Sequence, residues 1–214
     1  MPSTVVQLGL AAVLAAGLLA TAYDRRALAV VLVVGVVPEV DALAGPWLPG
    51  AHRALLHTLL IPIAAGAWLW WDTCYRDRSW LRDRWGTRGV RIAWVALFTH
   101  AFAHVLLDYA HLEGINAFYP VYDRFFRLEG ELFLSTTDGL LQTFVDIGTE
   151  TDVGAGGTTA NTHVANPIEP TADPTPEGPV DRRFPIAEQG WELFFAVTGL
   201  FVLVARRFQD RRDE

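Results

Sequence analysis

Residues 91–111 read RIAWVALFTHAFAHVLLDYAH, a run that is apolar apart from its first arginine and a few later ionisable residues. A helix needs about 20 mainly apolar residues to cross the hydrocarbon core of a bilayer, and this run is long enough. At about 100° per residue, the ionisable side chains after the arginine fall along one stripe. They are His100, His104, Asp108 and His111. The stretch therefore predicts a membrane helix with one ionisable face.

Apolar stretches elsewhere raise the expected number of crossings to about five. They lie at residues 4–23, 27–37 with a continuation through 41, 53–71, 91–110 and 191–205, the last beginning nearer 187. The first stretch also resembles a signal peptide, but the basic residues that usually precede one are missing from MPSTVVQ. Hydrophobic residues form 51% of the chain and the mean hydropathy is +0.24, as expected for a membrane protein. The predicted fold class is all-α, a multi-pass transmembrane helical bundle.

Arginine clusters predict the orientation of these helices. The clusters lie at residues 25–26, 76–88 and 206–212. With five crossings, all three fall on the same side, and basic residues in short loops favour the cytoplasm. The opposite side receives residues 111–190, which carry 13 acidic residues and 4 arginines. The sequence therefore predicts a multi-pass protein of the cell membrane with a cytoplasmic C-terminus and its ionisable stripe towards the outside.

Composition divides the chain into three parts. These are a transmembrane helical domain with the polar site (1–147), an acidic outer loop (148–186), and the last helix with a basic cytoplasmic tail (187–214). The outer loop is rich in Gly, Thr, Pro and Glu, so it buries too little apolar surface to offset its ordering entropy and is expected to be disordered. Before it, residues 131–136 predict a short strand, 138–139 a turn and 140–147 an interfacial helix.

Two simple counts exclude other classes of protein. Cys74 is the only cysteine, which rules out an internal disulfide and a cysteine-rich metal site. The formal net charge is -7, which argues against a nucleic-acid partner because phosphates need a broad basic surface.

The outer ends of the second, third and fourth helices carry groups that are costly in a membrane. The second ends in PEVD (38–41), and the third begins HRALLH (52–57). His104 and Asp108 are one turn apart, a spacing that lets both bind one metal ion. His52 and His57 would differ by about 140° on a regular helix, so either His52 precedes the helix or only one of the two is a ligand. Hydrogen bonds between helices and an ion or proton pathway are the alternatives to a metal site.

At these residues the chain resembles the YdjM-like family of membrane-bound, predicted metal-dependent hydrolases. The resemblance is carried by PEVD (38–41), His52-Arg53 through His57-Thr58, His104 to Asp108, and Tyr119-Pro120. It covers about residues 30–122. Glu39 replaces the aspartate usual in the family pattern, and residues 108–114 differ from its common Thr-Pro-Gly turn. The family is itself distantly similar to zinc-dependent phospholipase C and P1-type nucleases.

The resemblance implies metal-assisted hydrolysis of a phosphoester or other small or lipid-like anionic substrate at the outer membrane surface, with a divalent ion, zinc by expectation. The expected metal ligands are Asp41, His57, His104 and Asp108, with His52, His100 and His111 as lesser candidates. Glu39 is expected as general base or further ligand, and Arg53 as the group that orients the anion. A structural metal site and an ion or proton transporter are the rival functions.

Overall fold

The computed structural model describes residues 3–48, 50–111, 113–128, 130, 132–135, 139–142, 156–164, 166, 168–170, 184 and 186–210. Within those residues, the helical segments join into five rods. The first two are α1 (Thr4–Leu18) with the 3-10 turn η1 (Ala20–Ala22), and α2 (Arg25–Val36) with the 3-10 segment η2 (Val37–Ala44). The next two are α3 (Leu60–Trp70) with the π-helical η3 (Trp71–Tyr75), and α4 (Trp80–Thr99) with the π-helical η4 (His100–Val105) and α5 (Leu106–Tyr109). The last is α6 (Gly190–Asp210).

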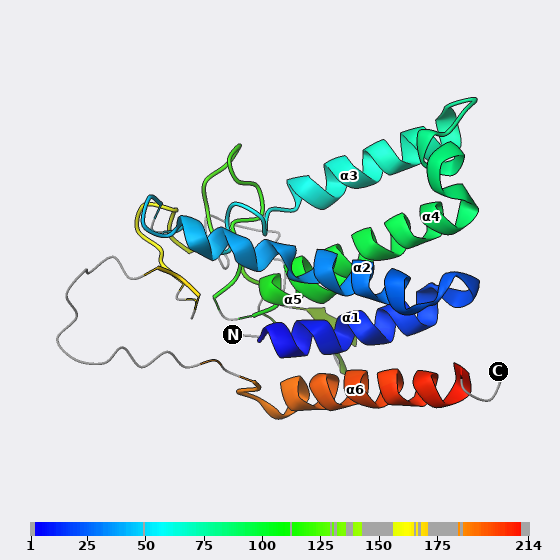
Figure 1. Cartoon of the computed structure of the whole chain (residues 1–214). Coiled ribbons are helices and arrows are strands. Elements are labelled where there is room, and N and C mark those ends of the chain that lie inside the picture. Colours follow the sequence, from blue (N-terminus) through cyan, green and yellow to red (C-terminus); the bar gives the residue numbers. More distant parts are fainter. Residues whose placement is uncertain are drawn as a thin grey trace.

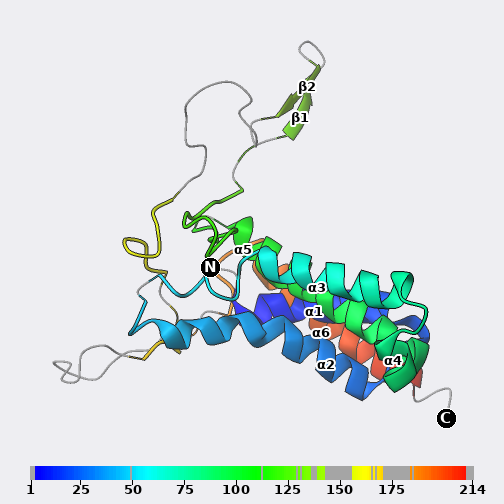
Figure 2. The ribbon, with the colours of Figure 1, turned by 90° about the horizontal axis from the view of Figure 1, so that it is seen from above.

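The rods lie side by side, with most of their length in roughly one direction (Figure 1 and Figure 2). Helix α1 contacts α2, α4 and α6, while α3 packs against α4. The largest apolar cluster joins the first, second and fourth rods and contains buried Ala15, Leu19, Ala27, Val31, Val95 and Ala96. The all-α prediction is therefore confirmed for the body of the chain.

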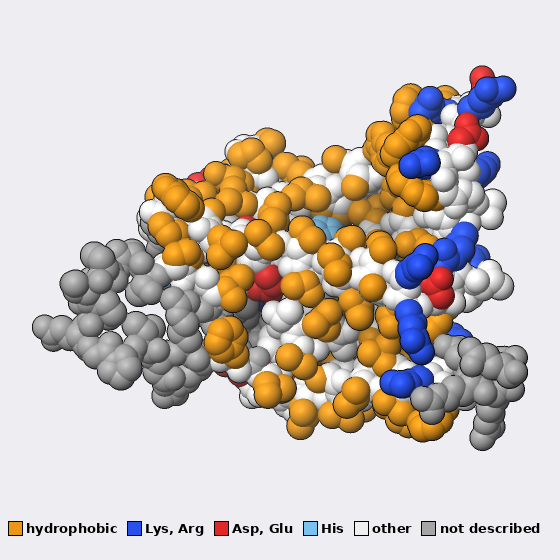
Figure 3. Space-filling model, in the orientation of Figure 1, with side chains coloured by type: hydrophobic (Ala, Val, Ile, Leu, Met, Phe, Trp, Pro, Cys, Tyr) orange, Lys and Arg blue, Asp and Glu red, His pale blue; other side chains and the backbone are white. Residues whose placement is uncertain are grey.

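Two of the rods contain a segment that is long and apolar enough to cross a membrane. These segments are Arg25–Ala44 and Trp80–Tyr109, and α1 is a shorter apolar helix. Hydrophobic side chains cover the middle of the molecular face seen in Figure 3. Arginines gather at one end of the same face, near the turns that join α1 to α2 and α3 to α4.

Helices α1 and α6 approach one another through glycines. A Cβ atom added to Gly199 would lie 2.4 Å from the Cα atom of Gly9, and one added to Gly9 would lie 2.6 Å from the Phe195 carbonyl oxygen. Both distances are too short for any side chain. Small residues thus let the two backbones touch, as is common between helices in membranes.

The second rod is longer than its regular α-helix. The sequence predicts a helix over 27–37 with a continuation to 41, and α2 does continue as η2 through Ala44. Pro38 stands at the start of η2, where its missing N–H costs little. The tighter 3-10 winding carries Glu39 and Asp41 to the end of the rod, and both side chains are buried.

The third helix begins later than predicted. Arg53 was the expected first residue, but α3 starts at Leu60 and the preceding residues form turns. Arg53 has φ 63°, in the left-handed region that a right-handed helix does not use. Its carbonyl accepts a 2.7 Å hydrogen bond from the Asn116 N–H, which ties this turn to the segment after α5. The helical spacing assumed for His52 and His57 therefore does not apply.

The fourth rod begins earlier than the predicted residue 91 and is irregular twice. Ser79 caps the start of α4 by accepting a hydrogen bond from the Arg82 N–H, and Gly86 then breaks the helix with φ 66°. From His100 to Val105 the helix widens into π geometry. Such wide turns alter the angle between successive side chains and are frequent at functional sites.

Outside the rods, two short strands form an antiparallel hairpin. They are β1 (Leu132–Ser135), which confirms the strand predicted at 131–136, and β2 (Gly139–Gln142). The interfacial helix predicted at 140–147 is wrong for residues 140–142, because these residues pair with β1. Residues 143–147 and Asp138 of the predicted turn lie outside the described residues.

Part of the predicted outer loop lies against the helical body. The Thr159 hydroxyl donates to Asp123 over 2.7 Å, the Gly50 N–H donates to the Thr159 carbonyl, and Val164 is buried with Phe125. These contacts differ from the disordered loop that composition predicts over 148–186. Polar side chains that find specific partners hold these residues, and a composition argument does not detect such partners.

Candidate metal centre

Three segments meet at the end of the helical body opposite the arginines. The segment η2 supplies Glu39 and Asp41, the turns before α3 supply the HRALLH residues, and the fourth rod supplies the last two polar groups. All of these side chains are buried: Glu39, Asp41, His52, Arg53, His57, His104 and Asp108. The structure thus brings together every main candidate predicted from the sequence.

Four donor atoms from this set converge. The Nε2 atoms of His57 and His104 are 2.9 Å apart. Asp108 Oδ2 lies 3.2 Å from the first and 3.6 Å from the second, and Glu39 Oε1 lies 3.8 Å from His104 Nε2. Donors at 2.0–2.1 Å from a tetrahedral zinc ion would lie about 3.3 Å from one another. The ligand atoms of Glu39, His57 and His104 all lie within 4.8 Å of one another, and Asp108 lies beside both histidines. These four residues, called the four-donor cluster below, could hold a metal ion.

One oxygen of the cluster has no hydrogen-bond partner within the described residues. Glu39 Oε2 accepts a 2.7 Å hydrogen bond from the Asn166 side chain, but its neighbour Oε1 is buried and accepts none. A buried carboxylate oxygen without a donor costs about 1–3 kcal/mol or more. A cation bound beside Oε1 would remove that cost.

Asp41 contacts Nδ1 of the His57 ring, while Nε2 of the same ring faces the converging donors. Its Oδ2 is 2.8 Å from His57 Nδ1, and its Oδ1 is 2.9 Å from His52 Nδ1. A carboxylate on one ring nitrogen fixes the imidazole tautomer and leaves the other nitrogen free to bind a metal. Asp41, His52 and His57 also form a second group whose donor atoms are close enough to hold an ion.

The charges of the site favour a divalent cation. Three carboxylates are buried here, those of Glu39, Asp41 and Asp108, beside a single buried guanidinium, that of Arg53. Burial alone would lower the pKa of His57, but hydrogen bonds to Asp108 and Asp41 raise it to about 9. A proton and a metal ion compete for the same imidazole nitrogen, so a raised pKa also marks a place where a cation is stabilised.

Arg53 is fully buried and already paired. Its Nη2 donates to Asp108 Oδ1 over 3.2 Å and its Nη1 to the Gly114 carbonyl over 3.1 Å. Glu113 Oε2 lies 3.6 Å from Nη1. The role predicted for Arg53, orienting an anionic substrate, therefore competes with its role of neutralising Asp108.

Two of the lesser candidates stand apart from the four-donor cluster. His100 is buried at the start of the π-helical segment, and its Nε2 has no hydrogen-bond partner within the described residues. His111 lies beyond the end of α5, with Nδ1 4.0 Å from Glu113 Oε2. His104 and Asp108 are the members of the predicted stripe that contact one another directly, while His100 begins the π-helical segment and His111 follows the end of α5.

Two polar side chains that sequence reasoning missed, Gln7 and Asn166, complete the site. Gln7 Nε2 on α1 lies 3.2 Å and 3.3 Å from the two oxygens of Asp108. A lone long polar side chain in an apolar helix was the signal that could have revealed it. Asn166 Nδ2 donates to Glu39 and lies 3.3 Å from His52 Nε2. No local pattern marks Asn166, because its partners are more than a hundred positions away.

A family model described as YdjM inner membrane protein matches residues 1–166, more than three quarters of the 214-residue chain. The chain belongs to the YdjM inner membrane protein family. Membership places it at an inner membrane and confirms the resemblance seen in the motifs. Neither the curated proteins nor the solved structures include a match to this chain.

The motifs that carried the YdjM resemblance lie in one region of the structure. The PEVD residues, the two histidines before α3 and the His104–Asp108 pair all belong to the site described above. The fourth motif, Tyr119-Pro120, lies beneath it, where Tyr119 packs against Ala54 and Phe125. The range matched by the YdjM model also includes Gln7 and Asn166.

Asn166→Ala should weaken metal binding by this YdjM-family protein about ten-fold, the lower end of the effect typical for groups that hold ligands in place. The change removes the donor to Glu39 and leaves all four converging atoms intact. Competition with a metal-sensitive dye would measure the affinity. Asn161→Ala is the matched control, since that side chain bonds only within its own turn among the described residues. Equal affinities of the two variants would show that Asn166 does not support the site.

Proposed function

We propose that this protein is a multi-pass membrane hydrolase whose divalent metal, zinc by ligand type, is held by His57, His104 and Asp108 of the four-donor cluster, with Glu39 as a further ligand or as the general base. The observation that carries the proposal is that two imidazole nitrogens and two carboxylate oxygens lie close together. Four of the distances between them, His57–His104, His57–Asp108, His104–Asp108 and His104–Glu39, are 2.9–3.8 Å. Imidazole and carboxylate together suit zinc better than the all-oxygen sites of magnesium or calcium.

The roles of the protein groups follow from their contacts. Asp41 holds His57 with Nε2 facing the cluster, and Arg53 and Gln7 hold Asp108 in place by hydrogen bonds. Glu39 has one oxygen held by Asn166 and one without a partner, so it can serve as a ligand or as the base that accepts a proton from water. These residues would hold a zinc ion, which would supply Lewis acidity for hydrolysis when bound.

The proposed substrate is an anionic ester at the outer membrane surface, with phosphoesters and phospholipids first. A divalent ion attracts phosphate oxygens, and the cluster lies near the ends of helical segments, with Glu39 in η2, His57 just before α3 and Asp108 near the end of α5. The arginine-rich end opposite the cluster supports the proposed orientation, in which that end faces the cytoplasm.

A structural metal site is the second candidate. All four converging donors come from the protein, and a closed tetrahedron with no position for water is typical of structural zinc. An ion or proton pathway is less favoured, because the stripe of His104 and Asp108 ends in apolar packing around Val95 and Ala96.

The purified wild-type protein should contain close to one zinc or other divalent transition metal ion per chain, and His104→Ala should contain almost none. The loss is expected because His104 supplies one of the four donors and no neighbouring side chain replaces it. Elemental analysis of detergent-purified protein measures the content. His163→Ala is the control, since His163 is exposed and paired with Glu169 away from the cluster. Metal content that is unchanged in His104→Ala would refute the assignment.

Glu39→Gln separates catalysis from a structural role. If Glu39 accepts a proton during hydrolysis, this variant should keep most of its metal and lose about 10²–10⁴-fold in turnover. Phosphodiester and phospholipid hydrolysis by the metal-loaded protein provides the assay. A wild-type protein with full metal content and no turnover on either substrate class would favour the structural site.

Cys74 offers a test of orientation. It is exposed near the turn between α3 and α4, at the arginine-rich end. A thiol reagent that does not cross membranes should label it only after the cells are lysed. In a Cys74→Ser background, Ala160→Cys should instead be labelled in spheroplasts, because residue 160 is exposed beside the opposite end. Labelling of Cys74 in intact spheroplasts would reverse the proposed topology.

A further inference from the structure

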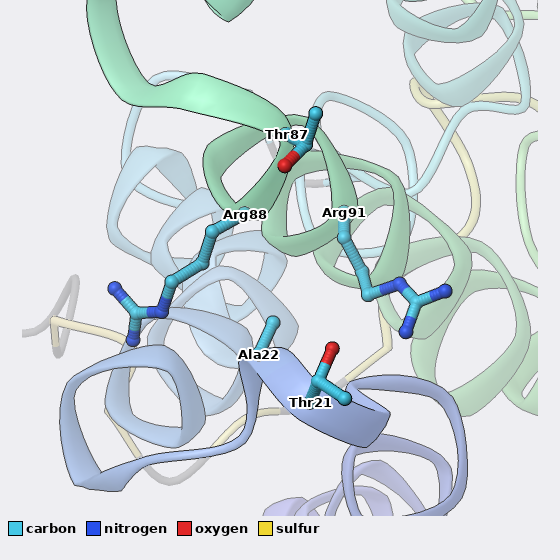
Figure 4. A pocket seen from close by; sticks show the side chains of 5 residues that line it. All are labelled: Thr21, Ala22, Thr87, Arg88 and Arg91. Atoms are coloured by element: carbon cyan, nitrogen blue, oxygen red, sulfur yellow. The ribbon is translucent and has the colours of Figure 1, made fainter.

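A pocket of about 330 Å³ lies at the arginine-rich end, between the end of the first rod and α4. It is lined by Thr21, Ala22, Thr87, Arg88 and Arg91. Figure 4 shows both arginine side chains reaching from α4 towards the segment that holds Thr21 and Ala22. Arg91 precedes His104 by 13 residues. This corresponds to about 20 Å along a helix, so the pocket is separate from the four-donor cluster.

A second pocket of about 370 Å³ adjoins the first and shares Thr87 and Arg91 with it. Its remaining lining is apolar: Leu18, Val90, Trp94, Val95 and Phe98. Together the two pockets form a groove, called the amphipathic groove below, that is polar at the arginine end and apolar further along α4. The apolar part lies within the Trp80–Tyr109 segment, which is apolar enough to cross a membrane.

The polar part of the groove carries a net positive charge. Arg88 forms an ion pair with Asp24, which leaves the exposed Arg91 as the charge without an ion-pair partner among the described residues. Thr21 and Thr87 add hydroxyl groups on opposite walls. Thr87 follows the break at Gly86, where the straight part of α4 begins, and the positive end of its dipole adds to the field.

We infer that the amphipathic groove binds an anionic phospholipid. Its phosphate lies against Arg91 and the two threonine hydroxyls, and an acyl chain lies along Val90, Trp94 and Phe98. A soluble phosphate would contact only the polar half of the groove. A lipid contacts both halves, with its headgroup at the membrane surface and its acyl chain in the hydrocarbon core. The Arg-rich end of a membrane protein faces the leaflet surface, where anionic headgroups are available. This inference does not depend on the proposed hydrolase activity.

The test is lipid binding by the detergent-purified full chain, followed by native mass spectrometry. Dioleoyl phosphatidylglycerol is the probe, dioleoyl phosphatidylcholine the neutral comparison, and inorganic phosphate the competitor. Arg91→Gln should weaken phosphatidylglycerol binding about five-fold, the worth of one arginine near an anionic headgroup. Arg84→Gln, an exposed arginine on the same rod outside the groove, should bind as the wild type does.

A second variant tests the apolar half without changing any charge. Leu18 is 46% exposed on the groove wall, so Leu18→Trp should fill the groove with little effect on packing and reduce lipid binding as well. Phosphatidylcholine binding as tight as phosphatidylglycerol binding, or equal affinities of Arg91→Gln and Arg84→Gln, would overturn the inference. Displacement of the lipid by millimolar inorganic phosphate, with Leu18→Trp unaffected, would overturn it too, because it would identify a simple anion site.

Discussion

Burial of three carboxylates between apolar helices is the constraint on which the rest of the structure depends. An ionised carboxylate in such surroundings is stable only when opposite charge and hydrogen-bond donors surround it. Arg53 and Gln7 donate hydrogen bonds to Asp108, and the Nδ1 atoms of His52 and His57 contact Asp41. Asn166 donates to one of the two oxygens of Glu39. These donors come from α1, from the turns before α3 and from the segment that contains Asn166. The charge therefore dictates which distant parts of the chain must meet.

Irregular backbone is what aims the side chains of the site. Glu39 and Asp41 lie on a 3-10 segment, His104 lies on a π-helical turn, and Arg53 adopts a left-handed conformation. Each departure leaves fewer regular helical hydrogen bonds at the end of a rod and so has a cost. Unusual backbone conformations persist only where many surrounding contacts hold them in place. They are common at functional sites.

The sequence predicted most of the helices, and the main candidate residues that it indicated lie together in the structure, because hydropathy and the spacing of His104 and Asp108 are local signals. It failed where long-range contacts decide the backbone. The turns before α3 are tied by the Asn116 bond to Arg53, and the described residues around Asn166 are held by contacts such as Asn166 with Glu39. Neither could be read from neighbouring residues. The position of Asp41 behind His57 likewise depends on how two separate segments pack.

The glycine contact between α1 and α6 has a consequence for biosynthesis. Its two halves, Gly9 and Gly199, are separated by nearly the whole chain. During synthesis, helix α1 is made well before its partner surface on α6. Until α6 is inserted, the Gly9 face of α1 lies open to lipid or to the insertion machinery. Because α1 also presents Gln7 to Asp108, insertion of α6 fixes the helix that supports this buried carboxylate.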